Sequence, residues 1–300
     1  MRYPLISGKL MNYHELSSYT TWKIGGPAEY FYYPTDLNDL IYFFKIWSKN
    51  KITVLGRGSN VLIRDGGING LVICLDNNLN RLAMVNHNVI YAEAGITLAD
   101  LVNHCTNLGM ADAAFMVGIP GTLGGALRMN AGSYSSQIWD YVESVVTIND
   151  YGILTNRAAK EFTYYYRGIF GLNINEWFVA AKLKFEITSR EKALSIAKNN
   201  LQKRKQSQPL DFPNCGSVFR NPPNLYAAKL IEDAGLKGKT IGGAKVSEKH
   251  ANFIVNFDQA TSCDVERLME LIINQVEKNY KITLIPEVQI LGSYESISSP

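Results

Sequence analysis

The sequence of 300 residues lacks the cysteine and histidine patterns that bind metals or form disulfide frameworks. Its four histidines have no H-E-x-x-H or similar spacing. Its four cysteines contain no C-x-x-C pair and lie far apart, at Cys74, Cys105, Cys215 and Cys263. This spacing is typical of reduced thiols rather than of bridges or a zinc site. We therefore expect free thiols and no bound metal.

Strong charge and long apolar runs are also missing. The formal net charge is +3, and the basic run Lys203-Arg204-Lys205 is more typical of a solvated helix end than of a nucleic-acid patch. No apolar run approaches the ~18–20 residues that a membrane span needs. The first ten residues lack the apolar segment of a secretory signal. These absences predict a cytoplasmic protein that binds neither nucleic acid nor membrane.

Apolar periodicity predicts a mixture of strands and helices without the regular alternation of a Rossmann fold. We expect short strands at residues 52–55, 61–63, 71–75, 89–92, 145–148 and 178–187. Thr97 and Asp100 resemble a capping box in front of a helix that ends at Gly109. Further helices are expected at 189–206, from Asn224 to Gly235, and from Asp264 onward. The polar helix and the proline-containing segment near 188–212 indicate a domain boundary.

Glycine is concentrated in the segment 118–132, where five of fifteen residues are glycine and most others are apolar or small. Glycine loses more backbone freedom on folding than any other residue, so such density indicates backbone that closely approaches something. That neighbour is either packed backbone or a large ligand, and the segment by itself does not decide. No P-loop lysine motif accompanies the glycines, which argues against nucleoside triphosphate hydrolysis.

A second glycine-bearing loop, Gly56-Arg57-Gly58-Ser59-Asn60, follows a predicted strand. It is not a dinucleotide fingerprint, because residues 61–63 begin another strand where a helix would be needed. Successive backbone N–H groups in such a loop can still bind phosphate. The alternative is a tight hairpin with chance polar residues. Together, the two glycine-bearing loops could enclose one extended cofactor.

Three downstream residues are candidates for chemistry, each with a structural alternative. Ser217 lies two residues after Cys215, and its hydroxyl is either a proton donor or an ordinary turn serine. Arg167 follows three tyrosines and either binds a substrate carboxylate or makes a cation–π contact. Glu287 lies between apolar residues and is either a functional acid or a charge at a strand edge.

In this order, the motifs resemble one family almost from end to end, the UDP-N-acetylenolpyruvoylglucosamine reductases of peptidoglycan synthesis. Single motifs are weakly specific, but the ordered set is very specific. The matching segments are 20–28, 55–60, 118–121, 129–132, 166–167, 216–222, 242–244, 250–253 and 286–288.

The resemblance implies an α+β protein with an FAD-binding fold of the vanillyl-alcohol-oxidase (PCMH) type and a C-terminal α/β substrate-binding domain. The implied domains are residues 1–76 and 77–200, as two FAD-binding subdomains, and 201–300 for the substrate. NADPH would reduce non-covalently bound FAD. A hydride from the flavin would then add to C3 of the enolpyruvyl group of UDP-N-acetylglucosamine enolpyruvate, and a proton to C2, giving UDP-N-acetylmuramate. A monomeric cytoplasmic enzyme serving cell-wall synthesis, and hence cell shape and division, is expected.

The resemblance also assigns residues. Ser217 matches the proton donor, while Arg167 and Glu287 match the pair that stabilises the enolate-like intermediate. The implied substrate contacts are Tyr134, Arg220, Asn221, His250 and Asn252. The implied cofactor contacts are Gly56, Arg57, Gly58, Ser59, Asn60, Gly118, Ile119, Pro120, Gly121, Gly124, Gly125 and Asn130.

The chain departs from the family pattern in two places. It lacks the serine that usually follows the Tyr-Arg pair, here Tyr166-Arg167. The short span from Arg167 to Ser217 fits the compact form of the family that lacks a tyrosine-bearing loop over the substrate. Cys215 is a second, weaker candidate for the proton donor.

Two rival hypotheses make different predictions. An alcohol or hydroxy-acid oxidase on the same fold would consume oxygen with its substrate. A catalytically silent nucleotide-sugar binding protein would be colourless.

Overall fold

The computed structural model describes residues 6–47 and 51–297, and the chain divides into two compact units. Unit 1 consists of Met1–Met11, Phe31–Arg57 and Leu71–Arg204, and unit 2 of Asn12–Tyr30, Gly58–Gly70 and Lys205–Pro300. Unit 2 thus combines the expected C-terminal domain with two segments that the sequence placed in the first subdomain. The division into 1–76, 77–200 and 201–300 stays a prediction.

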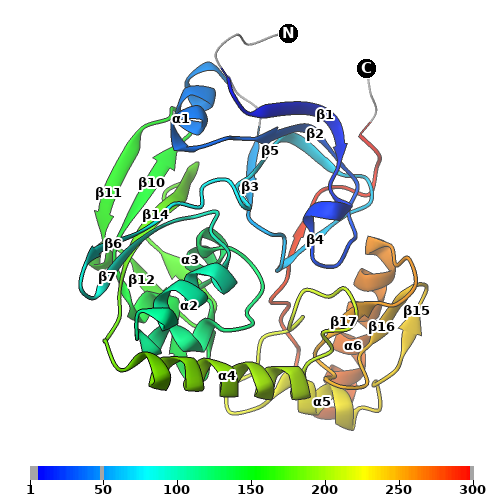
Figure 1. Cartoon of the computed structure of the whole chain (residues 1–300). Helices are drawn as coiled ribbons and strands as arrows, with labels where there is room; N and C mark the ends of the chain where they lie inside the picture. Colours follow the sequence, from blue (N-terminus) through cyan, green and yellow to red (C-terminus); the bar gives the residue numbers. More distant parts are fainter. Residues whose placement is uncertain (1–5, 48–50, 298–300) are drawn as a thin grey trace. The chain divides into compact units, whose positions relative to one another are not determined.

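Unit 1 contains a five-stranded antiparallel sheet with two helices beside it (Figure 1). The strand order is β11 (Leu154–Ala158), β10 (Val142–Asn149), β14 (Glu176–Lys184), β7 (Val89–Glu93) and β6 (Leu82–Asn86). The helices are α2 (Leu98–Asn107) and α3 (Leu123–Met129), and α3 contacts β14 and β7. Thr97 caps α2 by accepting a hydrogen bond from the Asp100 N–H at 3.1 Å, which confirms the predicted cap. Leu101, Leu127 and Phe178 belong to the core between these elements.

A four-stranded sheet has the order β1 (Lys9–Glu15), β2 (Pro27–Tyr33), β5 (Ile68–Cys74) and β3 (Ile52–Leu55). Within unit 1, β3 and β5 are parallel, with Leu55 opposite Cys74. The chain therefore leaves both strands at the same edge, at Gly56 and at Leu75. Helix α1 (Leu37–Ile46) follows β2.

Short hairpins and 3-10 turns complete unit 1 before helix α4 (Arg190–Ser207). The hairpins are β8 (Gly132–Ser133) with β9 (Ser136–Gln137), and β12 (Thr163–Tyr165) with β13 (Gly168–Phe170). The 3-10 turns are η2 (Ala111–Met116), η3 (Ile138–Asp140) and η4 (Ala159–Glu161), while η1 (Ser17–Tyr19) belongs to unit 2. Side chains of α4 bond other parts of unit 1: Arg190 bonds the Asn107 side chain, Asn200 donates to the Ala114 carbonyl, and Arg204 donates to the Gly118 carbonyl.

Unit 2 packs helices α5 (Ala227–Asp233) and α6 (Ser262–Tyr280) with a three-stranded sheet. The sheet has the order β15 (Thr240–Ile241), β16 (Ala244–Val246) and β17 (Ile254–Asn256). A second pair is parallel, β4 (Val61–Ile63) with β18 (Gln289–Leu291). Trp22 is fully buried and donates from its indole nitrogen to the Ile254 carbonyl at 2.7 Å.

Two helix starts in unit 2 differ from the prediction. Helix α6 begins at Ser262, because Thr261 is its N-cap and Asp264 closes the capping box from the third helical position. The expected start at Asp264 was therefore wrong: an acid inside the first turn was taken for the cap. Helix α5 begins at Ala227, because Asn224 has a left-handed backbone that cannot start a helix.

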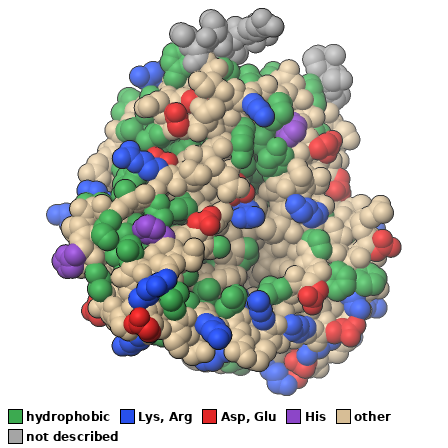
Figure 2. Space-filling view, in the orientation of Figure 1, with side chains coloured by type: hydrophobic (Ala, Val, Ile, Leu, Met, Phe, Trp, Pro, Cys, Tyr) green, Lys and Arg blue, Asp and Glu red, His purple; other side chains and the backbone are tan. Residues whose placement is uncertain are grey.

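Within the described ranges, no helix combines the length and apolarity needed to cross a membrane. Figure 2 shows basic and acidic side chains interspersed across the face that it draws.

Candidate active site

In unit 2, the segment after Ser217 forms a short antiparallel ladder with the segment that carries Glu287. The Glu287 N–H donates to the Val218 carbonyl at 2.7 Å, and the Arg220 N–H donates to the Ile285 carbonyl at 2.9 Å. Residues 70 positions apart in the sequence are thus held at neighbouring positions beside an isolated antiparallel bridge between Phe219 and Pro286. Two of the three predicted catalytic residues therefore share one rigid backbone element.

The turn that presents Ser217 is open on one side. Gly216 has φ +81, a conformation that L side chains rarely adopt, and a Cβ atom there would meet nothing within 4 Å. Asn214 fixes the turn by accepting a hydrogen bond from the Gly216 N–H and donating to the Pro209 and Phe212 carbonyls. Ser217 itself is partly exposed. Ser217 thus follows a turn whose backbone is fixed and which has free space beside Gly216.

Asn252 fixes the other end of this turn. It is 4% exposed, and its side chain bonds both backbone groups of Phe219: Oδ1 accepts from the N–H at 3.0 Å, and Nδ2 donates to the carbonyl at 2.8 Å. The Asn252 carbonyl also accepts from the Val218 N–H. The Asn252 side chain therefore makes the two hydrogen bonds to Phe219 that the backbone of a neighbouring strand would otherwise make. We interpret Asn252 as a positioning residue.

Cys215 is less suited than Ser217 to reach a ligand, because it is only 4% exposed. Burial raises the pKa of the Cys215 thiol well above its ordinary value, and the negative charge of Glu287 adds to this effect. The thiol is therefore neutral.

The predicted cofactor loop 56–60 is divided between the units, with Gly56 and Arg57 in unit 1 and Gly58, Ser59 and Asn60 in unit 2. The Asn60 side chain donates to the Glu287 carbonyl at 3.1 Å, and its own carbonyl accepts from the Gln289 N–H. A Cβ on Gly58 would lie 2.2 Å from the Tyr19 carbonyl oxygen. Within unit 2, Gly58 thus admits neighbouring backbone, and Asn60 bonds the backbone of the segment that bears Glu287.

Three more predicted substrate contacts lie in unit 2. Asn221 is exposed, and its Oδ1 accepts from the Ala227 N–H at the start of α5. Arg220 Nε and His250 Nδ1 are buried atoms with no hydrogen-bond partner in the described part of the chain. Burial lowers the pKa of His250 from 6.5, which favours the neutral ring. Unsatisfied buried nitrogens of this kind are rare, so both are compatible with ligand contacts.

Arg167, the third predicted catalytic residue, lies in unit 1 at the tip of the β12–β13 hairpin. Its backbone is left-handed, with φ +60, and its Nη2 donates to the Gly132 carbonyl at 3.1 Å. Its guanidinium also lies over the Tyr166 ring, 5.0 Å from the centroid. The cation–π contact that we considered as an alternative is therefore present. Strained backbone at a residue other than glycine is frequent at functional sites.

Asn130 connects this hairpin to the glycine segment. It is fully buried, ends α3 in the left-handed conformation, and donates to the Tyr165 carbonyl at 2.9 Å and the Gln137 side chain at 2.7 Å. Although predicted as a cofactor contact, its amide is thus used to hold the hairpins of unit 1.

Tyr134 lies at the tip of the β8–β9 hairpin with its side chain 43% exposed, and it donates to the Asn200 carbonyl of α4 at 2.8 Å. Next to it, Arg204 donates to the Gly118 carbonyl at 3.0 Å and to the Ser133 hydroxyl at 3.2 Å. Burial lowers the pKa of Arg204, and the charge of Arg167 acts in the same direction. Arg204 thus joins the start of the glycine segment to the hairpin with Tyr134. No sequence motif indicated this role.

The glycines of unit 1 differ in what surrounds them. A Cβ on Gly118 would lie 2.7 Å from Arg204 Cδ, and one on Gly124 would lie 3.0 Å from the Ala94 Cβ. Apart from the backbone of α3 itself, a Cβ on Gly125 would meet only Thr122 Oγ1 among the described residues, at 3.9 Å, and Gly56 also faces Thr122. Most of the segment is therefore packed against the chain, whereas Gly125 faces open space. The remaining predicted contacts, Ile119, Pro120 and Gly121, connect η2 to α3.

The residues of unit 1 therefore fit a large cofactor in one place, beside Gly56, Thr122 and Gly125. Open space at Gly125 admits a ligand, and the buried Thr122 hydroxyl has no hydrogen-bond partner in the described part of the chain. Arg57, directly after Gly56, supplies positive charge for a phosphate. These features fit FAD.

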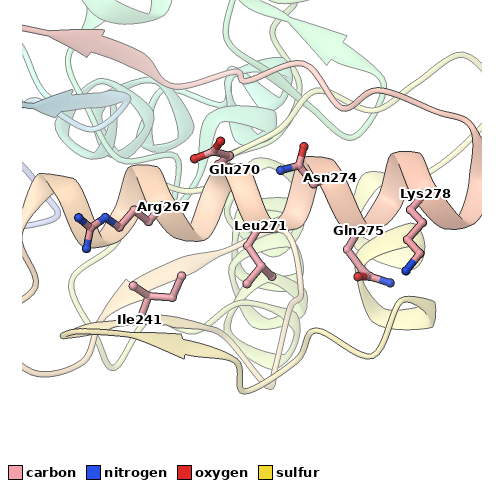
Figure 3. Close-up of a pocket in the computed structure, with 7 residues that line it drawn as sticks. All are labelled: Ile241, Arg267, Glu270, Leu271, Asn274, Gln275 and Lys278. Carbon is pink, nitrogen blue, oxygen red and sulfur yellow. The ribbon is translucent and has the colours of Figure 1, made fainter.

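A groove elsewhere in unit 2 lies along α6 and includes none of the predicted site residues (Figure 3). Its lining residues are Ile241, Arg267, Glu270, Leu271, Asn274, Gln275 and Lys278.

Comparison with known proteins identifies the family. Residues 28–156 match the family model of an FAD binding domain, and residues 208–291 that of the UDP-N-acetylenolpyruvoylglucosamine reductase C-terminal domain. The reductase of Coxiella burnetii (strain Dugway 5J108-111) is 45% identical, with 96% of this chain and 97% of that protein covered. The reductase of Methylococcus capsulatus is also 45% identical, with 96% and 95% covered.

A solved structure agrees with these sequence relatives. The crystal structure of the reductase (MurB) from Thermus caldophilus matches with a TM-score of 0.82 and 28% identity, covering 96% of this chain and 100% of that one. The predicted α+β class, with an FAD-binding fold and a C-terminal domain, is confirmed, and the cofactor is FAD. The chain belongs to the UDP-N-acetylenolpyruvoylglucosamine reductase family.

Proposed function

We propose that this chain is an FAD-containing oxidoreductase that uses NADPH to reduce UDP-N-acetylglucosamine enolpyruvate to UDP-N-acetylmuramate, a peptidoglycan precursor. The observation that carries the proposal is the ladder that holds Ser217 and Glu287 at neighbouring positions, with free space beside Gly216. The 45% identity to reductases of this name over 96% of the chain supports it. The rival hypothesis, an alcohol oxidase on the same fold, does not explain why Ser217 and Glu287 are held at neighbouring positions.

FAD, when bound and reduced by NADPH, would supply the hydride, and the chain's residues would bind, orient and protonate the substrate. Gly56, Arg57 and the open side of the segment 118–125 would hold the cofactor. Ser217 donates the proton to C2 of the enolpyruvyl group from a turn fixed by Asn214 and Asn252.

The charge that develops on the substrate carboxylate needs fixed partners, because such stabilisation acts mainly in the transition state. We assign this role to the Arg167 guanidinium, a fork that matches a carboxylate, and to the Glu287 carboxyl, which shares a proton with the enolate-like intermediate. Tyr134, Arg220, Asn221 and His250 are proposed substrate contacts.

An absorbance experiment on the purified protein tests the proposal. Anaerobic NADPH should bleach the flavin bands, and the enolpyruvyl nucleotide should then restore them. A preparation that is bleached by NADPH but recoloured only by oxygen, or bleached by an alcohol without NADPH, would contradict the proposal.

We also propose that the enzyme is a cytoplasmic monomer whose product feeds cell-wall synthesis, and thereby cell shape and division. Light scattering coupled to size-exclusion chromatography tests the monomer: a mass near 33.5 kDa is expected, and twice that mass would reject it.

A further inference from the structure

The backbone of Glu287 is fixed on both sides of its Cα atom. Its N–H donates to the Val218 carbonyl at 2.7 Å. Its carbonyl accepts from the Asn60 side chain at 3.1 Å and from the Gln289 side chain at 3.3 Å. Because the two peptide planes that flank a residue set the direction of its Cα–Cβ bond, these contacts decide where the Glu287 carboxyl can point.

Asn60 is the better placed of the two side-chain partners. It is partly buried, whereas Gln289 is exposed and makes the longer hydrogen bond. A further contact ties the same two segments together, because the Asn60 carbonyl accepts from the Gln289 N–H at 3.0 Å. Asn60 therefore binds the segment that bears Glu287 through both its side chain and its backbone.

The loop that presents Asn60 is itself anchored in unit 2. The Gly58 carbonyl accepts from the Thr21 N–H at 3.2 Å. The next residue, Trp22, is fully buried and bonds β17 twice, donating from its indole nitrogen at 2.7 Å and accepting at its carbonyl at 3.0 Å. The Asn60 side chain thus extends from backbone that is fixed to the core of unit 2.

Two different amides support the proposed catalytic residues of unit 2. Asn252 holds the backbone just after Ser217, and Asn60 holds that of Glu287. The hydrogen bond from the Glu287 N–H to Val218 joins the two segments. A carboxyl that shares a proton with the intermediate needs accurate placement, because an error of about 1 Å can lower a rate by about 10²-fold.

We propose that Asn60 is a positioning residue for Glu287, and that it acts on reduction of the enolpyruvyl nucleotide through that carboxyl; this rests on the proposed function. The Asn60 amide serves the substrate step, while the backbone N–H groups of its loop remain for the cofactor. No local pattern indicated this role, because Asn60 and Glu287 are 227 positions apart.

The test compares two isosteric substitutions in the holoenzyme, Asn60→Asp and Asn256→Asp. Each replaces an amide that donates to a backbone carbonyl of unit 2 with an ionised carboxylate, which only accepts. Stopped-flow absorbance gives the limiting rate of flavin reoxidation by the enolpyruvyl nucleotide. We expect about a tenfold loss for Asn60→Asp, larger than any loss in flavin reduction by NADPH, and less than twofold for Asn256→Asp.

A double-mutant cycle separates positioning of Glu287 from a merely structural role. Glu287→Gln removes the carboxyl, so adding Asn60→Asp to it should lower the limiting rate by less than a further twofold. Independent effects would multiply and give the full tenfold loss again. Asn60→Ala, which introduces no charge, should behave like Asn60→Asp and serves if that variant folds poorly.

Three results would overturn the proposal: multiplicative losses in the cycle, equal losses in both half-reactions of Asn60→Asp, or equal losses in Asn60→Asp and Asn256→Asp. A limiting rate within twofold of wild type in both Asn60 variants would do the same. Failure of the proposed function is recognised separately, because wild-type flavin would then not be reoxidised by the enolpyruvyl nucleotide, and this inference would fall with it.

Discussion

The glycine segment of unit 1 and the Gly216 turn of unit 2 use glycine for different reasons. At Gly118 and Gly124, the space of the missing side chain is filled by Arg204 and Ala94 of the same unit. At Gly216 that space is empty among the described residues, and glycine is favoured there by its φ of +81 alone, whereas Gly118 combines close packing with a φ of +71. A high density of glycine therefore indicates close packing as well as ligand binding. A glycine that faces a ligand is recognised by the empty space where its side chain would be.

The largest effect on activity is expected at Ser217, the proposed proton donor in the open turn after Gly216. Ser217→Ala should slow flavin reoxidation by the enolpyruvyl nucleotide by about 10²-fold or more, because a positioned proton donor is lost. Reduction of the flavin by NADPH should be nearly unchanged. Stopped-flow absorbance at the flavin band measures both half-reactions.

Cys215→Ala is the control for Ser217→Ala. The buried thiol is not expected to donate the proton, so reoxidation should stay within a few-fold of wild type. If both half-reactions slow together in Ser217→Ala, or if Cys215→Ala is the slower variant, the assignment to Ser217 is wrong.

Replacing Asn252, which holds the backbone of this turn, should give the next largest effect. Asn252→Ala leaves the buried N–H and carbonyl of Phe219 without partners, which should lower the free energy of unfolding by about 2–4 kcal/mol. Asn252→Asp keeps the acceptor and loses the donor, so an intermediate loss is expected. Urea denaturation followed by circular dichroism measures the difference. A loss below about 0.5 kcal/mol in Asn252→Ala would argue against the positioning role.

A matched pair in unit 1 tests the comparison of glycines directly. Gly118→Ala places a Cβ against Arg204 at φ +71 and should destabilise the fold by about 1–2 kcal/mol. Gly125→Ala lies in α3 beside open space and should stabilise the fold by about 0.5–1 kcal/mol. FAD affinity should nonetheless fall in Gly125→Ala. Equal stabilities, or unchanged FAD binding in Gly125→Ala, would remove the distinction between a packed and a ligand-facing glycine.

The smallest effect concerns pH. Burial holds the folded-state pKa of His250 below its ordinary value of 6.5, so the unfolded chain takes up the proton first as the pH falls. The stability from neutral His250 is complete above about 6.5 and is lost as the pH falls from there toward the folded pKa. His250→Gln should therefore lose less stability than wild type between pH 7.5 and 5.5 in urea titrations. A parallel decline in both proteins would count against this.

Local sequence signals predicted a large part of the fold. Thr97 and Asp100 were identified as a cap because capping depends on residues three positions apart. The strands at 52–55 and 61–63 were found because short apolar runs with β-branched residues are also local signals. The start of α6 was misplaced, because an acid at the cap and one inside the first turn look alike without the backbone.

For the candidate site, the sequence supplied residue types and a family resemblance but few of the supporting contacts. Asn252 was read as a substrate contact, whereas its amide is bonded to Phe219. Asn60 was read as a cofactor contact, and its side chain donates to the Glu287 carbonyl, 227 positions away. Such hydrogen bonds join residues that are far apart in the sequence, and no periodic pattern of residues predicts them.

The sequence by itself determined the N-cap of α2, the strands at 52–55 and 61–63, the absence of metal-ligand spacing and the family, because these follow from local patterns and the order of motifs. Tertiary structure decided which glycines are packed, which amides are already bonded, and that the buried Thr122 hydroxyl has no hydrogen-bond partner in the described part of the chain. The physical reason is that burial and hydrogen-bond satisfaction are properties of neighbours in space. The glycine segment 118–132 thus predicted backbone in close contact with a neighbour, and only the folded chain showed that Gly125 is the position open to a ligand.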